Sequence, residues 1–298
     1  MTDILSIIQP QQIPDTLYHY TTQAGLLGIL QNDEIWATHT QYLNDQREYR
    51  HALKLVRDEI QKRKSNTTDS EEKAVLGEMY SAIIAGVEFI NICVCSFSEV
   101  GDSLSQWRAY GGTAGGFAIG FHGGFLANAA KTQNAFLVPC VYELDQQRNI
   151  IEKFVDMVLH ENLAHRGVEE SGDDDDFWRH GGNLRPFLNQ IAPAMKDPSF
   201  REEEEWRIIS RPLMCTTERF AYRQGKSTIV PYFRFPLSKT ANEAGQPTIR
   251  EVVIGPTPDP HLSERSMRSL LTSHRLTSHS APGGPVTVRI SDVPYRNW

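Results

Sequence analysis

Short strand-like segments dominate this chain from Phe89 onward, and they do not alternate with helices in a regular rhythm. Apolar runs and period-two patterns mark such segments at 17–20, 89–97, 116–121, 135–142, 204–210, 228–235, 249–254 and 286–291. A doubly wound parallel sheet needs a crossover, usually a helix, between successive strands, and that rhythm is missing here. The pattern therefore predicts an α+β fold with a mixed or antiparallel sheet.

Helical periodicity is concentrated in a few stretches of the chain. In 44–64 the apolar residues recur every three or four positions, as they do along one face of a helix. Further helices are predicted at 23–30, 71–87, 103–110, 149–165, 177–195 and 262–273. Because no internal repeat and no long low-complexity linker divides the chain, we expect one domain, 1–298, with a helical insertion at about 145–197.

Charge and composition narrow the class of protein. The 298 residues carry a net charge of −7, which disfavours a general nucleic-acid binder but leaves a local basic patch open. The hydrophobic fraction of 40% is ordinary for a globular protein. No apolar run reaches the roughly 18 residues that span a bilayer, and no secretory signal is recognisable. We therefore expect a cytoplasmic protein without a membrane partner.

Several familiar site types are missing from the sequence. No phosphate-binding GxxxxGK[ST] loop occurs, and the glycines at 111–116 precede a strand, which is the wrong context for a dinucleotide fingerprint. The ten histidines make neither HExxH nor HxH spacing, so we expect no metal. The four cysteines are read as buried free thiols.

The first candidate site segment ends a predicted strand. His19 and Tyr20 precede Thr21 there, ahead of a predicted helix. A histidine in this place can offer a ring N–H to a ligand hydroxyl, although a lone histidine is also a common structural residue.

Hydroxyl and aromatic side chains gather in the second segment. Ser96 and Ser98 end the predicted strand, and the following helix presents Trp107, Arg108 and Tyr110. An arginine beside aromatic rings suits a diphosphate next to a flat ring. Ordinary core packing of the two aromatic residues is the alternative.

Four glutamates at 202–205 lead directly into an apolar strand. Strand alternation predicts that Glu203 and Glu205 share a face, while Trp206 faces the core. The two carboxylates would repel each other, so we expect either a neighbouring cation or a raised pKa. Glutamates are depleted in strands, and such a departure often marks a functional site. A solvated charged turn is the alternative.

Taken together and in order, these motifs resemble a known family. They are LYHYTT at 17–22, LNDQRE at 43–48, CSFS at 95–98, QWRAYG at 106–111, FREEEEWR at 200–207 and VVIGP at 252–256. Over roughly 17–256 the chain resembles the bacterial family catalogued as domain of unknown function 2971. That family in turn resembles the ADP-ribosyltransferase fold, including DarT-type toxins and the His-Tyr-Glu class.

The resemblance implies NAD⁺ as substrate, no metal, and a split sheet with helical insertions. It implies that the segment around His19 holds the adenosine ribose and the nicotinamide region, and that Ser96 and Ser98, as a Ser-x-Ser element at the end of a middle strand, also bind NAD⁺. Glu205 would be the catalytic residue, stabilising an oxocarbenium-like transition state, and Glu203 would orient or deprotonate the acceptor. Tyr110 or Trp107 would stack on nicotinamide, and Arg108 would pair with the diphosphate.

Three functions follow from this resemblance. The first is an ADP-ribosyltransferase acting on a macromolecule, as a toxin or an anti-phage defence effector. The alternatives are an NAD⁺ glycohydrolase and a non-catalytic module that binds a nucleotide or a partner protein. Protein, nucleic acid and free nucleotide all remain open as the acceptor. We further expect Glu205→Gln to abolish nicotinamide release with little change in melting temperature.

Overall fold

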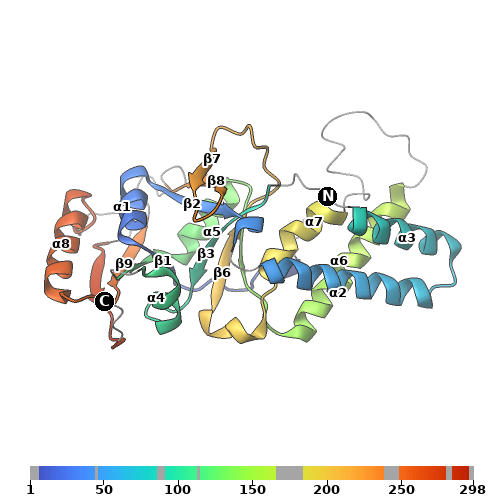
Figure 1. Ribbon diagram of the computed structural model, residues 1–298, viewed down its shortest axis with the longest axis horizontal. Helices are drawn as coiled ribbons and strands as arrows, with labels where there is room; N and C mark the ends of the chain where they lie inside the picture. The colour runs from blue at the N-terminus through green and yellow to red at the C-terminus, as the bar shows by residue number, and fades with distance from the viewer. Residues whose placement is uncertain are drawn as a thin grey trace.

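The computed structural model describes residues 7–43, 46–85, 91–112, 115–165, 184–237, 248–279 and 284–294. Its centre is an open ten-stranded sheet, seen near the middle of Figure 1. The strands are β1 Thr16–Thr21, β2 Glu34–His39, β3 Cys93–Ser98, β4 Phe117–His122, β5 Phe136–Pro139, β6 Glu205–Ile209, β7 Phe220–Gln224, β8 Ile229–Pro236, β9 Ile249–Ile254 and β10 Thr287–Ile290. The α-helices are α1 Gln23–Asn32, α2 Gln46–Asn66, α3 Ser70–Ala85, α4 Leu104–Tyr110, α5 Gly123–Thr132, α6 Leu144–His165, α7 Leu184–Ile191 and α8 Pro260–Ser273.

The strand order confirms an α+β fold. The main path runs β10-β9-β4-β1-β3-β2-β8-β7, and β6 pairs with both β3 and β5. All of these pairs are antiparallel except β10 with β9. The sheet is therefore mixed and mostly antiparallel, as the segment pattern predicts.

The sheet divides at β3. One edge of β3 pairs along its whole length with β6. Its other edge pairs with β2 near the start of the strand, at Cys93 and Val94, and with β1 only at Ser98. In the described residues the middle of β3, from Cys95 to Phe97, therefore has no ladder partner on that edge. Backbone N–H and C=O groups that have no partner in a ladder need other hydrogen-bond partners. A side chain that enters this gap can supply them.

Helices cover both faces of the sheet and produce two cores. On one face α1, α5 and α8 bury Leu26, Leu126 and Met267 against strand residues that include Ile208. On the opposite face of β3, β6 and β5, a bundle of α2, α3, α6 and α7 packs around Phe154. Figure 1 shows this bundle at one end of the molecule and α1 and α8 at the other.

The helical bundle is assembled from two separate parts of the chain. We expected a helical insertion at about 145–197, and α6 and α7 lie within that stretch. They pack against α2 and α3, which come from the first third of the chain. Val56 and Ile60 of α2 and Val155 and Val158 of α6 are fully buried in this shared core. The predicted insertion therefore packs against two helices, α2 and α3, that are distant from it in the sequence.

Among the described residues, the sequence does not predict one α-helix, α5, and two strands, β2 and β7. The helix α5 opens with Gly123 and Gly124, which disfavour helix, but the His122 side chain caps it by accepting the Phe125 amide at 3.3 Å. Strands β2 and β7 are short and carry polar or alanine residues. Their pairing with β8 forms them, because strand formation depends on cross-strand contacts more than on propensity.

Parts of the predicted pattern lie outside the described residues. These are Asn44 and Asp45 of the LNDQRE motif, the side chain of Glu48, the acidic run at 169–176 and the first part of the helix predicted at 177–195. Where the structure describes the chain, no helix combines the length and apolarity that a membrane crossing requires.

Candidate functional site

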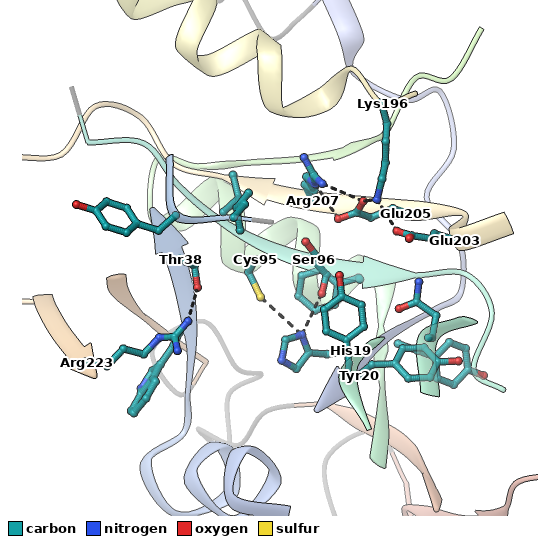
Figure 2. Close-up of a pocket in the computed structure, with 18 residues that line it drawn as sticks. His19, Tyr20, Thr38, Cys95, Ser96, Lys196, Glu203, Glu205, Arg207 and Arg223 are labelled. Atoms are coloured by element: carbon teal, nitrogen blue, oxygen red, sulfur yellow. Dashed lines mark hydrogen bonds and ion pairs between the residues drawn. The ribbon is translucent and has the colours of Figure 1, made fainter. Parts of the chain in front are cut away.

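A cavity of about 260 Å³ opens at the division of the sheet (Figure 2). Its walls come from β1, β2, β3, β6, β7, α4 and the segment that precedes β6. The volume is slightly below the roughly 300–1,000 Å³ usual for small-molecule sites. Predicted site residues line it together: His19, Tyr20, Ser96, Tyr110, Glu203 and Glu205. Segments far apart in the sequence therefore meet at one hollow.

His19 fills the gap in the β3 ladder. Its Nδ1 lies 3.0 Å from the Ser96 carbonyl oxygen, which can only accept, so Nδ1 carries the proton. Burial lowers the pKa of the imidazole, only partly opposed by this bond, and the ring is neutral at pH 7. Nε2 is therefore an acceptor, and no partner for it occurs among the described residues. This corrects the expected ring N–H: a ligand hydroxyl would donate to His19.

Glu205 is the first residue of β6 and is held between two cations. Its Oε1 accepts from Arg207 Nε at 2.7 Å, and its Oε2 accepts from Arg207 Nη2 at 3.0 Å and from Lys196 Nζ. Burial alone would raise the pKa of this carboxyl, but the charges of Arg207 and Lys196 outweigh it and lower the pKa to about 2. Glu205 is thus an anion at neutral pH and does not act as a general acid.

Lys196 is the cation that relieves the repulsion between the two carboxylates. Its Nζ donates to both Glu203 and Glu205 and lies 5.2 Å from the centre of the Phe200 ring. Only 2% of Lys196 is exposed. Burial would lower the pKa of its ammonium group, but the charge of Glu205 and the hydrogen bonds to Glu203 and Glu205 together raise it. Of the two outcomes expected from the sequence, the neighbouring cation is the one found.

Glu203 is the more accessible of the two carboxylates. Its side chain is 17% exposed, against 6% for Glu205, and its Oε2 accepts from Lys196. Within the described part of the chain, its Oε1 has no protein donor. Trp206 and Ile208 enter the core on the other face of β6, as alternation predicts. The free oxygen of Glu203 can therefore meet a ligand.

Two tyrosines flank the carboxylates and the histidine. Tyr20 is buried and fixed, since its hydroxyl donates to the Val100 carbonyl at 2.8 Å and accepts the Ser103 amide at 3.0 Å. Tyr110, at the end of α4, is 41% exposed. Burial of its phenol group, with the charges of Glu205 and Glu203, raises the pKa of Tyr110 to about 12. Tyr110 is therefore the accessible aromatic ring beside the acidic pair.

Ser96 and Ser98 differ in their position relative to the cavity. Ser96 lines the cavity and supplies the carbonyl that fixes His19. Ser98 is 2% exposed, and its hydroxyl donates to the Glu203 carbonyl at 2.7 Å and accepts the Val100 amide at 3.1 Å. Ser98 thus positions the backbone before β6 and is not itself among the residues that line the cavity.

Like Ser98, three further predicted ligand residues do not line the cavity. Trp107 is 2% exposed, packs edge-on against Tyr20 at 4.7 Å between ring centres, and donates from Nε1 to Asp102 at 2.7 Å. Arg108 is exposed elsewhere on α4. The Thr21 side chain lies against Gly25 of α1. Of the two aromatic residues expected to stack on nicotinamide, only Tyr110 therefore lines the cavity.

Cys95 lies beside His19, with its Sγ 3.9 Å from Nδ1. A cysteine and a histidine so close would suggest a nucleophilic pair. Burial, together with the negative charge of Glu205, raises the pKa of the Cys95 thiol. Moreover, His19 Nδ1 already donates to the Ser96 carbonyl and carries no free lone pair toward the thiol. Cys95 is therefore a buried thiol rather than a reactive thiolate.

Two cationic side chains of the site, Lys196 and Arg223, are not predicted from the sequence. Lys196 precedes Asp197 and Pro198 in a stretch typical of a solvated turn, so nothing local marks it as buried. Arg223 lies on β7, a strand that was not predicted, and its Nη2 is 3.4 Å from the Thr38 hydroxyl. Among the described residues, no three His, Cys, Asp or Glu side chains converge as a metal site would require.

Comparison with known proteins gives one match. A family model described as "Protein of unknown function (DUF2971)" matches residues 106–208. This stretch runs from α4 through most of β6 and contains Tyr110, Lys196, Glu203 and Glu205. The match supports the resemblance to that family which the motifs indicate. No curated protein and no solved structure matches the chain.

Proposed function

We propose that this chain cleaves the nicotinamide–ribose bond of NAD⁺ and transfers ADP-ribose to an acceptor, as an ADP-ribosyltransferase does. One observation carries the proposal: His19 of β1 and the Glu203–Glu205 pair face a single cavity at the division of the sheet. A neutral acceptor nitrogen, an ionised carboxylate and an accessible aromatic ring suit a ribose, its developing positive charge and a nicotinamide ring.

The proposed reaction begins with cleavage at the ribose C1′. The bond from C1′ to the nicotinamide nitrogen breaks, and both of its electrons leave with neutral nicotinamide. The ribose then resembles an oxocarbenium ion, which the negative charge of Glu205 stabilises. A carboxylate has about four acceptor positions, and Glu205 uses three, so Oε1 can still accept from a ribose hydroxyl.

The second half forms a new bond from C1′ to the acceptor. The acceptor's lone pair adds to C1′, and the proton that it loses passes to a base. Glu203 has the free oxygen for this step, and its greater exposure fits contact with a second substrate. If the acceptor is water, the same geometry produces an NAD⁺ glycohydrolase. Whether ADP-ribose is transferred or NAD⁺ is hydrolysed therefore depends on which molecule, an acceptor group or water, reaches Glu203.

Lys196 and Arg207 set the ionisation of Glu205. They keep it charged down to a pH of about 2, so the catalytic carboxylate needs no prior loss of a proton at neutral pH. Lys196 and Arg207 also weaken the electric field of Glu205 at a distance, because these two cations and the carboxylates of Glu203 and Glu205 together have no net charge. The stabilisation of the ribose therefore depends on close approach of C1′ to Glu205 rather than on long-range attraction.

The test is to incubate the purified protein with labelled NAD⁺ and a cell lysate. Free nicotinamide and ADP-ribose bound to macromolecules are followed in parallel. Release together with labelling supports the transferase, and release without labelling supports the glycohydrolase. If neither signal appears and calorimetry detects no NAD⁺ binding, both enzymatic functions are refuted. NAD⁺ binding without release would leave the chain a non-catalytic binding module.

Matched variants assign the roles within the run of glutamates. Glu205→Gln should lose nicotinamide release, whereas Glu203→Gln should lose mainly transfer to the acceptor. Glu204→Gln is the control, because Glu204 carries the same charge but does not line the cavity within the described structure. Loss of release in the Glu204 variant, with full release in the Glu205 variant, would contradict the assignment.

A further inference from the structure

The cavity has an excess of positive charge at one end. Of its three charged basic residues, Lys196 and Arg207 are neutralised by Glu203 and Glu205. Arg223, the third, has no carboxylate partner within the described residues. Its one described contact is a long hydrogen bond, 3.4 Å, to the neutral Thr38 hydroxyl. Arg223 is partly buried, so water can solvate its guanidinium in the free protein, and an anion that enters the cavity can form charge-assisted hydrogen bonds with it.

The position of Arg223 is opposite the acidic pair. Figure 2 shows Arg223 and Thr38 on one side of the cavity and Glu203, Glu205 and Lys196 on the other, with His19 between them. Arg223 is contributed by the edge strand β7, and Thr38 by β2. A ligand long enough to reach from Arg223 to the carboxylate pair would therefore place an anionic group at Arg223 of β7 and a sugar at His19.

Aromatic rings accompany Arg223. Trp36 and Tyr42 also line the cavity, and they are 47% and 42% exposed. The Trp36 ring is held by Tyr232, whose ring centre lies 4.5 Å away at an interplanar angle of 33°. Such exposed, fixed rings offer apolar faces on which a base can stack. A cation in the same cavity as these faces favours a nucleoside phosphate over a free inorganic anion.

We propose that Arg223, in the cavity that Trp36 and Tyr42 also line, forms a phosphate subsite that takes the diphosphate of a nucleotide. This subsite deepens the proposed function and rests on it for the orientation of NAD⁺: the diphosphate lies at β7, and the nicotinamide ribose lies at Glu205. Arg223 replaces Arg108, which does not line the cavity. A planar guanidinium binds phosphate through two parallel hydrogen bonds, which a lysine cannot reproduce.

The experiment measures binding of ADP and of inorganic pyrophosphate by calorimetry, without any reaction. Arg223→Gln should weaken ADP binding about 10- to 100-fold, as expected for loss of charge-assisted hydrogen bonds. Arg223→Lys should recover part of the affinity. Lys226→Gln is the matched control, because it removes a positive charge from the β7–β8 turn without touching the cavity. Melting temperatures of all variants check that each is folded.

Unchanged ADP affinity in a folded Arg223→Gln variant would overturn the subsite, as would wild-type protein that binds no ADP. Pyrophosphate binding as tight as ADP would overturn the nucleoside assignment. The same variants separate this inference from the proposed function. ADP binding that depends on Arg223, without nicotinamide release by the wild type, refutes the reaction and keeps the subsite. Nicotinamide release with the same KM for NAD⁺ in Arg223→Gln refutes the subsite and keeps the reaction.

Discussion

Glu205→Gln should destabilise the fold, because it removes the shared anion of two buried cations. Lys196 is 2% exposed and Arg207 4%, and each donates to Glu205. The fall of the Glu205 pKa from 4.5 to about 2 corresponds to roughly 3 kcal/mol of folding stability at neutral pH. Loss of one partner from a buried pair costs about 3–5 kcal/mol. We therefore predict a loss of about 3 kcal/mol, which replaces the expectation of an unchanged melting temperature.

Urea unfolding of wild type and Glu205→Gln at pH 7 measures this loss directly. Because the pKa is lower in the folded protein, the stabilisation is complete above about pH 4.5 and is lost as pH falls toward 2. The difference between the two proteins should therefore shrink on acidification below about pH 4.5. Glu204→Gln, on the same run of glutamates, should unfold like wild type. Equal unfolding free energies for Glu205→Gln and wild type at pH 7 would refute the buried ion cluster.

Other positions give further tests. Trp107→Phe should lower the unfolding free energy by about 1–2 kcal/mol through loss of its bond to Asp102, and a raised KM for NAD⁺ instead would place Trp107 at the ligand. Any transition of the KM for NAD⁺ that reflects His19 should lie below about pH 6.5, because burial lowers the pKa of His19, and a transition at or above 6.5 would contradict this. Tyr110→Ala should raise that KM about tenfold while Tyr110→Phe keeps it, and equal effects of both variants would exclude stacking.

The fold class and much of the site follow from local patterns. Strand β9 coincides with the predicted segment 249–254, in which Ile249 and the run Val252–Ile254 are apolar and buried. Alternation in β6 correctly separates Glu205 from Trp206, since a period of two is a property of any strand. His19 and Ser96, which the resemblance assigns to the same site, lie together, with His19 Nδ1 3.0 Å from the Ser96 carbonyl oxygen.

Other parts of the site depend on tertiary contacts. Lys196 looks like a solvated turn residue, and its burial comes from packing of the preceding segment against β6 and α6. Arg223 lies on an edge strand that is formed by pairing with β8, so no local pattern marks it. Trp107 is buried, which is the packing alternative that the sequence leaves open, because a buried and a ligand-facing tryptophan have the same sequence signature. Contacts between segments that are distant in the sequence therefore determine whether these three side chains are buried or line the cavity.

The central claim is that Glu205 stabilises the opening of NAD⁺ at the nicotinamide ribose. The most direct measurement is the rate of nicotinamide release by wild type, Glu205→Gln and Glu204→Gln, below the melting temperature of each protein. We predict that Glu205→Gln lowers kcat by about 10²- to 10⁴-fold while Glu204→Gln keeps it, as expected for loss of an electrostatic group. Release by Glu205→Gln at the wild-type rate would contradict the account.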